Sequence, residues 1–283
     1  MLKNLLLKQH SSHLFNSTSF LFFLLGVAFT LVFAPFNLYI LTSIFMMPVF
    51  FVCLRSTPKQ AAIYLFFFGF GHFLSGVYWV YISIHTFGNA PFWIALLLMF
   101  GLVVLMSSYF YLAGYLISWL VSGQSSLLIL VGPSVWVLFE WIKGWIFSGF
   151  PWLSIGYSQI DTFLSGWGPV LGVYGVSWFL LFSSTAFLHF YLKKRYFSAL
   201  SIILLPYLFG ALLLSYSWTE DLDQPIAISI IQGGISQDLK WKNEQLPKTM
   251  DLYLQATLNT ENDSFVIWPE VAIPASLDQL ESY

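Results

Sequence analysis

The sequence predicts a polytopic α-helical membrane bundle, with about seven transmembrane helices, followed by the β-α-β start of an α/β domain. Three observations lead to this fold class. The 283 residues are 58% hydrophobic and 8% charged, whereas an average soluble domain is about 25% charged. Long apolar runs fill the chain as far as Trp218 and then stop. Residues 1–218 carry a net charge of +6 and residues 219–283 one of −8, which predicts two different domains.

The transmembrane domain is predicted to be residues 1–218. A membrane-spanning helix needs about 20 mainly apolar residues. Seven stretches approach or meet this length, at 14–34, 37–54, 60–83, 91–121, 127–147, 169–191 and 197–217. The second stretch is short, because it begins only after the turn-forming sequence at 34–37.

The positions of the basic residues predict the orientation. Lys3 and Lys8 precede the first stretch, Arg55 and Lys59 lie between the second and third, and residues 193–195 lie between the sixth and seventh. Basic residues are enriched in cytoplasmic loops. The sequence therefore predicts a multi-pass protein of the bacterial inner (cytoplasmic) membrane. Its N-terminus is expected in the cytoplasm and residues 219–283 in the periplasm.

Residues 219–283 alternate strand, helix and strand patterns. The β-branched run 225–231 predicts a strand buried on both faces. Residues 244–258 predict an amphipathic helix, with an apolar stripe of Leu246, Met250, Leu254 and Leu258. A second strand is expected at 264–268, before Pro269. This order predicts a parallel strand pair with a crossover helix. Such a unit buries too little surface for a stable α/β core, so we expect an incomplete domain. The alternative is a small cap on the membrane domain.

The composition also excludes several classes of function. Disordered chains and nucleic-acid-binding domains need many more charged residues. One cysteine excludes a disulfide framework and a cysteine-rich metal site. The sequence contains no phosphate-binding glycine loop and no metal-ligand cluster, so we expect no cofactor, no metal and no nucleic-acid partner.

Several short motifs together are more specific than the composition. In chain order they are Phe33-Ala34-Pro35-Phe36, the stretch Ser75–His85, Gly149-Phe150-Pro151-Trp152 with Gly156-Tyr157-Ser158-Gln159, Gln232-Gly233 with Leu239-Lys240-Trp241, and Ile267-Trp268-Pro269-Glu270. With this order and topology, the chain resembles the bacterial apolipoprotein N-acyltransferases. The resemblance runs from about residue 20 to the last residues.

The resemblance implies a membrane bundle that carries a periplasmic nitrilase-like (carbon–nitrogen hydrolase) domain, which is an α/β sandwich, and then a last transmembrane helix. It implies an enzyme that completes lipoprotein maturation. The acyl donor is a phospholipid. The acceptor is the α-amino group of the N-terminal diacylglyceryl-cysteine of an apolipoprotein. The reaction passes through a thioester on an enzyme cysteine, and the catalytic residues are Glu, Lys and Cys in that chain order.

Glu270 matches the catalytic glutamate that the resemblance implies. A carboxylate at the end of a buried strand is held rigidly at the edge of a cleft. Pro269 ends the strand just before Glu270. Such a group can serve as a general base for a thiol. The alternative is an ordinary exposed acid after a strand.

The lysine and cysteine of the catalytic set have no match in this sequence. The only cysteine, Cys53, precedes Glu270 and lies near the cytoplasmic end of the second stretch, and no lysine follows Lys248. We therefore expect a truncated, split or interrupted copy that is inactive alone. A second chain could supply the missing catalytic half.

Three further residues are candidates for supporting roles. Trp241 matches a tryptophan near the active-site mouth in the family, and it is alternatively a packing residue. Glu140 and Lys143 lie three apart in an apolar stretch and hence on one helix face. They are expected to form a structural intramembrane pair, either below the active-site cavity or near the membrane edge.

Two other classes of function stay open at this point. One is a non-enzymatic transporter or scaffold that uses the helical bundle alone. Against a transporter, Glu140 and Lys143 are the only charged residues inside the predicted spans that we expect to be buried. The other alternative is a decayed, inactive copy of the enzyme.

Overall fold

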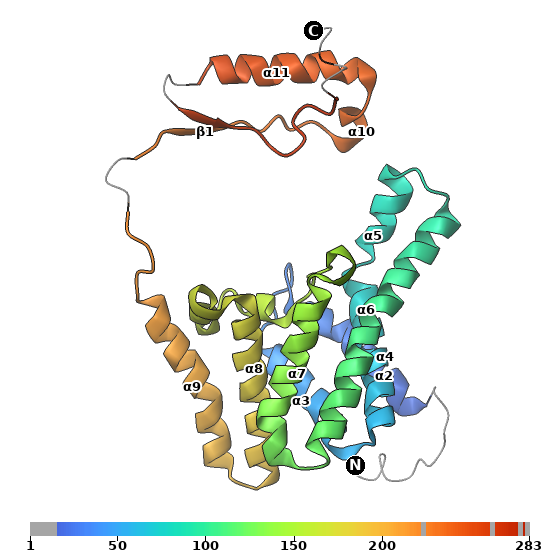
Figure 1. Ribbon diagram of the computed structural model, residues 1–283, viewed down its shortest axis with the longest axis vertical. Helices are drawn as coiled ribbons and strands as arrows, with labels where there is room; N and C mark the ends of the chain where they lie inside the picture. The colour runs from blue at the N-terminus through green and yellow to red at the C-terminus, as the bar shows by residue number, and fades with distance from the viewer. Residues whose placement is uncertain (1–15, 222–224, 261–263, 277–279, 281–283) are drawn as a thin grey trace. The chain divides into compact units, whose positions relative to one another are not determined.

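The computed structural model describes residues 16–221, 225–260, 264–276 and 280. Two compact units divide the chain (Figure 1). The first, here called the helical unit, holds Met1–His85 and Ala90–Trp218. The second, the C-terminal unit, holds Thr86–Asn89 and Thr219–Tyr283.

Long helices make up most of the helical unit. From the N-terminal side the described elements are α2 (Ser17–Phe29), the 3₁₀ turn η1 (Thr30–Val32), α3 (Leu41–Arg55), α4 (Pro58–Gly76), α5 (Trp79–Ile82), the π turn η2 (Ser83–Phe87), α6 (Phe92–Val121), α7 (Ser125–Lys143), the 3₁₀ turns η3 (Ile146–Ser148), η4 (Ile155–Gln159) and η5 (Phe163–Trp167), α8 (Gly168–Leu192) and α9 (Tyr196–Leu214). Each of the seven predicted apolar stretches overlaps one of the helices α2, α3, α4, α6, α7, α8 and α9.

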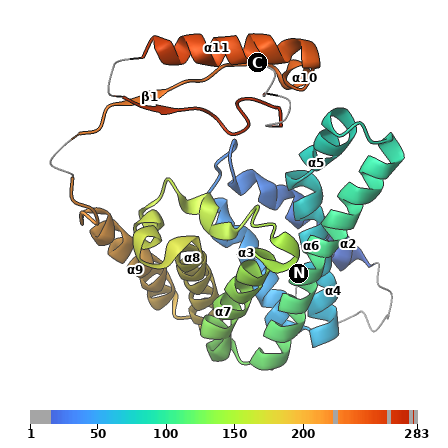
Figure 2. The same cartoon turned by 45° about the horizontal axis from the view of Figure 1, so that its top comes forward.

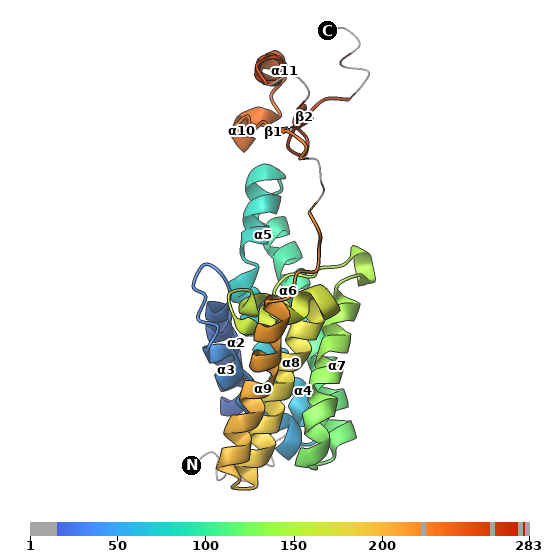
Figure 3. The same cartoon turned by 90° about the vertical axis from the view of Figure 1, so that its left-hand side faces the viewer.

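Helix α4 is the centre of one half of the bundle, and α8 is the centre of the other. Helix α4 packs against α2 and α6, and α8 packs against α7 and α9; α8 and α9 lie side by side in Figures 1 and 3. The start of α4 follows from its sequence. Thr57 accepts from the backbone N–H of Gln60, the Gln60 side chain reaches back to Thr57, and Pro58 occupies the first turn.

Two glycines let α2 and α4 approach closely. A Cβ atom built on Gly26 would overlap the main-chain oxygen of Phe68, and one on Gly71 would overlap that of Phe23. Small residues at such crossings are a general means of packing membrane helices. Gly101, in the middle of α6, differs from them because a Cβ there has no neighbour within 4 Å.

This contrast gives a prediction for the stability of the bundle. Gly26→Ala is expected to lower the free energy of unfolding by about 1–3 kcal/mol, because the helices must move apart. Gly101→Ala, the control, is expected to be neutral or to stabilise α6 by about 0.5–1 kcal/mol, because alanine is the better helix former. Unfolding of the detergent-solubilised protein by a denaturing detergent measures both. Equal stability of the two variants would contradict this packing.

Four helical segments are long and apolar enough to cross a membrane, namely Phe92–Val121, Ser125–Lys143, Phe163–Leu192 and Tyr196–Leu214. A fifth span results if Pro58–Gly76 and Trp79–Phe87, which are bent by 49°, form one crossing. The apolar helices Ser17–Val32 and Leu41–Arg55 are shorter. A 15-residue helix is only about 22 Å long, against about 30 Å of hydrocarbon. The described residues therefore indicate a multi-pass membrane protein with four or five spans of full length, and a count of seven is not confirmed.

The C-terminal unit contains a parallel pair of strands and a crossover helix. Strand β1 (Ile228–Ile230) leads through α10 (Gln237–Lys240), η6 (Asn243–Gln245) and α11 (Leu246–Leu258) to β2 (Phe265–Ile267). Ile228 pairs with Phe265 and Ile230 with Ile267. The predicted strand–helix–strand order and the parallel pairing are therefore present.

Two details of the prediction for this unit are wrong. The first strand is not buried on both faces: Ile228 is 58% and Ile230 76% exposed. Within the described residues of the unit, α11 is the one long helix beside the two strands, and apolar strand positions stay exposed. The apolar stripe of α11 is also only partly its buried face. Leu246 and Met250 are half-buried and Leu254 and Leu258 exposed, whereas Thr249 and Tyr253, which lies near the stripe, are buried.

Candidate functional site

The motif that contains Glu270 lies at the carboxyl edge of the strand pair. β1 and β2 are parallel and in register, and the N–H of Ile231 donates to the main-chain oxygen of Ile267 at 3.0 Å. Gln232-Gly233 and Trp268-Pro269-Glu270 therefore leave the sheet at the same edge. In open α/β sheets this is the edge where ligands bind.

The backbone immediately after Glu270 adopts an unusual conformation. Val271 has φ 53°, which is a true outlier for a β-branched residue. Strained backbone of this kind clusters at functional sites and costs about 1–3 kcal/mol. Glu270 itself is exposed, so its carboxylate can be reached from solvent within the C-terminal unit.

The segment after β1 returns to Glu270. The Nζ atom of Lys240 lies 3.5 Å from the main-chain oxygen of Glu270, in position to donate to it. Trp241 is the next residue and is 61% exposed. Two parts of the chain that the sequence separates by about 30 residues therefore meet at one end of the unit. The contact through Lys240 is not evident from the sequence, where Lys240 reads equally well as a solvated surface charge.

A small core holds this end of the unit together. The indole N–H of Trp268 donates to Thr257 Oγ1 at 3.0 Å, and its ring lies 5.1 Å from that of Tyr253. A Cβ on Gly233 would lie 2.6 Å from the Tyr253 hydroxyl. The Gln232-Gly233 and Trp268-Pro269-Glu270 motifs are therefore packed on the same residue of α11.

The second candidate site, Glu140 and Lys143, is buried at the end of α7. Glu140 is 6% exposed and Lys143 2%. Glu140 Oε1 accepts from the indole N–H of Trp136 at 3.2 Å and from the backbone N–H of Ile155 at 2.8 Å. Its other oxygen, Oε2, has no partner among the described residues.

Lys143 bonds to the same part of the chain as Glu140. Its Nζ donates to the main-chain oxygen of Trp152 at 2.9 Å and lies 5.4 Å from the centre of the Phe73 ring. No hydrogen bond joins Glu140 directly to Lys143, although both lie in the described part of the chain. Instead, both charged groups hold residues 152–155, which follow α7.

Residues 144–167, here called the connecting segment, lie across the ends of the helices (Figure 2). Gln159 Nε2 donates to Thr42 Oγ1 of α3 at 3.3 Å, and the N–H of Gly156 donates to Ser177 Oγ of α8 at 2.9 Å. Leu153 has φ 58°, and a Cβ on Gly76 would overlap its side chain. The Gly-Phe-Pro-Trp and Gly-Tyr-Ser-Gln motifs are thus fastened to the bundle from several sides.

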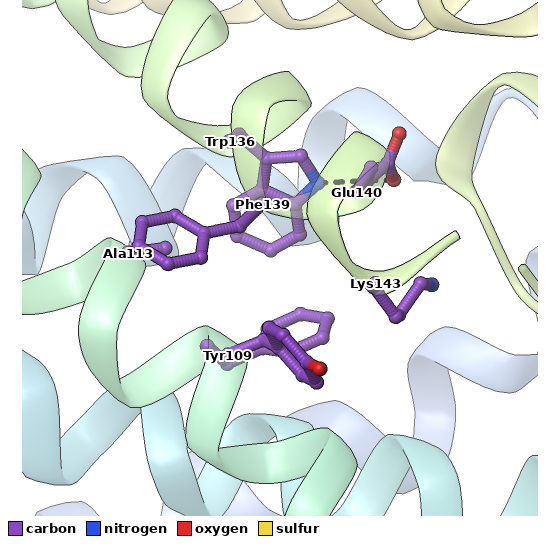
Figure 4. Close-up of a pocket in the computed structure, with 7 residues that line it drawn as sticks. Tyr109, Ala113, Trp136, Phe139, Glu140 and Lys143 are labelled. Atoms are coloured by element: carbon purple, nitrogen blue, oxygen red, sulfur yellow. Dashed lines mark hydrogen bonds between the residues drawn. The ribbon is translucent and has the colours of Figure 1, made fainter. Parts of the chain in front are cut away.

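The cavity beside Glu140 is too small for a substrate. It measures about 10 Å³ (Figure 4) and is lined by Tyr109, Phe110, Ala113, Trp136, Phe139, Glu140 and Lys143. This is about the space of one water molecule. No lipid or peptide fits in this cavity. Glu140 and Lys143 are therefore placed to stabilise the structure and not to bind a substrate.

Cys53 is 1% exposed in α3, among core residues of the helical unit. A polypeptide of residues 1–283 is accordingly expected to form no acyl-thioester and to resist maleimide labelling until it is unfolded. Mass spectrometry after incubation with phospholipid measures the first property, and labelling before and after denaturation measures the second. An acyl adduct on Cys53 in the folded protein would contradict this assignment.

Within the described ranges, no group of three or more His, Cys, Asp and Glu residues is placed to hold a metal ion. The two candidate sites contain carboxylates, ammonium groups and hydrogen-bond donors. Among the carboxylates of these two sites, that of Glu270 is exposed to solvent and lies at the carboxyl edge of the sheet.

Comparison with known proteins identifies the family. Residues 25–186 match the sequence model of the apolipoprotein N-acyltransferase N-terminal domain. The chain is 36% identical to an apolipoprotein N-acyltransferase of Methylococcus capsulatus, with 90% of this chain and 51% of the relative covered. It is 34% identical to the apolipoprotein N-acyltransferase of Coxiella burnetii, with 91% of this chain and 54% of the relative covered. It is 36% identical to that of Nitrosomonas europaea, with 91% of this chain and 52% of the relative covered.

The chain therefore spans about half the length of the curated relatives it matches. Nothing in these matches supports a second chain as the source of the catalytic half. The match over residues 25–186 runs from the end of α2 into α8 and includes the connecting segment, where most of the recognised motifs lie. On these grounds the chain belongs to the apolipoprotein N-acyltransferase family.

Proposed function

We propose that this chain supplies the membrane bundle and the first part of the catalytic domain of an enzyme that N-acylates apolipoproteins. The acyl donor is a phospholipid. The acceptor is the α-amino group of the N-terminal diacylglyceryl-cysteine. The names of the relatives and the match of the N-terminal domain support this function over that of a transporter or scaffold.

The observation that carries the proposal is the position of Glu270 at the carboxyl edge of a parallel β-α-β unit. In this proposal residues 219–283 are the N-terminal part of a nitrilase-like domain. The uncovered faces of β1 and β2 and the exposed leucines of α11 support it, because a complete α/β sandwich buries such positions.

Glu270 acts as the general base. It takes the proton of the enzyme cysteine, whose thiolate attacks the ester carbonyl of the phospholipid. The C–O bond breaks, and the lysophospholipid oxygen leaves with the proton held on Glu270. The amine of the acceptor then attacks the thioester, and the amide forms as the cysteine is released. In the family order Glu, Lys, Cys, the lysine and the cysteine both follow the glutamate. Cys53 does not fit the role, because it is buried and precedes Glu270.

Trp241 lies at the mouth of the site in this proposal. Its exposed indole sits beside Lys240, which contacts the Glu270 main chain. Amphipathic rings of this kind settle at the lipid–water interface. Glu140 and Lys143 have a supporting role: they hold the connecting segment in place at the end of the bundle.

The proposed orientation puts the N-terminus in the cytoplasm and residues 219–283 in the periplasm, with the helices in the inner membrane. It does not depend on whether the short helices α2 and α3 cross the bilayer. A turn joins these two helices. The number of crossings is therefore larger by two when both cross the bilayer than when neither does. Seven spans and five spans therefore give the same orientation for the C-terminal unit.

The test is acyl transfer by the purified product of the gene, including the sequence that follows codon 283. The protein is incubated with phospholipid carrying a labelled acyl chain and a diacylglyceryl-cysteine peptide. The proposed function predicts a labelled amide on the peptide and a labelled, hydroxylamine-sensitive enzyme before the peptide is added. A folded protein that hydrolyses or ignores the lipid and leaves the peptide unmodified would refute it.

A further inference from the structure

An apolar groove lies between α2, α3 and the last turns of α8. Its volume is about 720 Å³, within the usual range of about 300–1,000 Å³ for ligand sites. Its lining is almost entirely apolar and comes from Leu21, Phe22 and Leu25 of α2, Phe51 and Val52 of α3, and Leu188 of α8, among others. Water is a poor occupant of such a groove, whereas a hydrocarbon chain gains contacts along its whole length.

Basic residues follow the groove-lining parts of α8 and α3 in the sequence. Tyr191, in the last turn of α8, lines the groove, and Leu192 alone separates it from the basic run 193–195. Phe51 also lines it, and Arg55 is one turn further along the same face of α3. The side chains of Arg55, Lys193, Lys194 and Arg195 are exposed, and none of them bonds to another described residue.

Aromatic rings connect the groove to these basic residues. The rings of Phe187 and Tyr191 lie 5.8 Å apart and those of Tyr191 and Tyr196 5.7 Å apart. Phe187 and Tyr191 both line the groove, and Tyr196 follows Arg195 directly. The arrangement is that of an acyl-chain site with a polar aromatic rim and a cationic headgroup site beyond it.

From this geometry we infer that the groove binds an anionic glycerophospholipid of the surrounding bilayer. One acyl chain lies between α2, α3 and α8, and the phosphate lies against Arg55 and the basic run 193–195. The site is at the opposite end of the 25-residue helix α8 from the connecting segment. In the proposed orientation this end of α8 faces the cytoplasm and residues 219–283 the periplasm. The inference rests on that orientation in treating the lipid bound here as a resident lipid and not the acyl donor.

The test is native mass spectrometry of the delipidated full-length protein with phosphatidylglycerol and with phosphatidylcholine of identical acyl chains. We expect tighter binding of phosphatidylglycerol. Each basic residue near an anionic headgroup contributes roughly a fivefold change in affinity. Arg55→Gln is thus expected to weaken binding roughly fivefold, and the combination of Arg55→Gln, Lys193→Gln and Arg195→Gln on the order of 100-fold. Lys59→Gln removes the same charge from α4, a helix that does not line the groove, and is expected to leave the affinity within about twofold.

A second pair of variants tests the apolar part. Leu21 lines the groove and Phe20 does not, although both are about half exposed on α2. Leu21→Trp is expected to fill the groove and abolish the preference for phosphatidylglycerol, whereas Phe20→Trp is expected to keep it. Both sites already face outward, so neither change overpacks the core.

Three results would overturn the inference. The first is equal binding of the two lipids by the unmodified protein. The second is equal binding by Arg55→Gln and Lys59→Gln. The third is binding that appears only after residues 2–13 are removed, because this would assign the groove to the chain's own N-terminal segment. A loss of acyl transfer with unchanged lipid binding would refute the proposed function and leave this inference standing.

Discussion

Replacing Glu270 with glutamine is expected to lower the rate of N-acylation by about 10²–10⁴-fold, the usual contribution of a positioned general base. Glutamine keeps the size of the side chain but cannot accept the proton of a thiol. The structure supplies the reason to choose this acid over its neighbours. Glu270 follows β2 at the carboxyl edge of the parallel pair, and Lys240 contacts its main chain.

Glu244→Gln is the matched control, because Glu244 is an exposed acid of the same unit that lies in η6 and in neither the strands nor the Trp268-Pro269-Glu270 motif. The measurement is the rate of label transfer from phospholipid to a diacylglyceryl peptide by the purified gene product. Glu244→Gln is expected to retain the rate within about twofold. Equal rates for Glu270→Gln and Glu244→Gln would remove Glu270 from the catalytic set.

Replacing Glu140 with alanine is expected to lower the free energy of unfolding by about 3–5 kcal/mol. The change leaves the buried donors of Trp136 and Ile155 without an acceptor and Lys143 without a nearby acid. An average polar contact between membrane helices contributes only about 0.6 kcal/mol. The larger figure applies here because the acceptor is charged and buried, and because one of its donors is a backbone amide that cannot turn away.

Glu140→Gln is the matched control, since its amide oxygen can still accept from the Ile155 N–H. We expect it to lose less than half as much stability as Glu140→Ala. Unfolding in detergent gives the free energies, and protease cleavage within residues 144–167 reports release of the connecting segment. If Glu140→Ala stayed within about 0.5 kcal/mol of the unchanged protein, the buried carboxylate would not hold the segment.

The helical part of the fold is predictable from the sequence because the apolar runs are long and the turns between them carry Gly, Pro or charge. All seven stretches overlap a helix. The number of full-length spans is not predictable in the same way. The turn at 34–37 shortens α3, which the sequence already indicates. The break after Gly76 bends the stretch 60–83, which the hydropathy pattern treats as continuous.

The C-terminal unit shows where pattern reasoning fails. The strand–helix–strand order follows from local patterns, and the parallel pairing follows from that order. Which faces are buried does not follow from local patterns, because burial depends on the segments that pack against each face. Leu254 and Leu258 form a clear stripe, yet Thr249 and Tyr253 of the same helix are the buried residues.

The sequence likewise identifies some residues of the candidate sites but not the groups that they contact. Glu270, Trp241, Glu140 and Lys143 stand out in the sequence through a motif or through charge in an apolar run. Their partners do not: Ile155 and Trp152 contribute only backbone groups, which carry no signal in the side-chain sequence. The one available hint is chemical, since a buried carboxylate requires donors and the nearby Gly- and Pro-rich segment can bring backbone N–H groups inward.

The most direct test of the proposed enzyme is complementation of a bacterium depleted of its own apolipoprotein N-acyltransferase. The gene for this chain, with the sequence that follows codon 283, is expressed there, and the N-terminal peptide of a lipoprotein is weighed by mass spectrometry. We predict that the unchanged gene adds the mass of one acyl chain in amide linkage and that the Glu270→Gln gene does not. A membrane-inserted, folded product that leaves the peptide diacylated would contradict the account and identify the chain as an inactive copy.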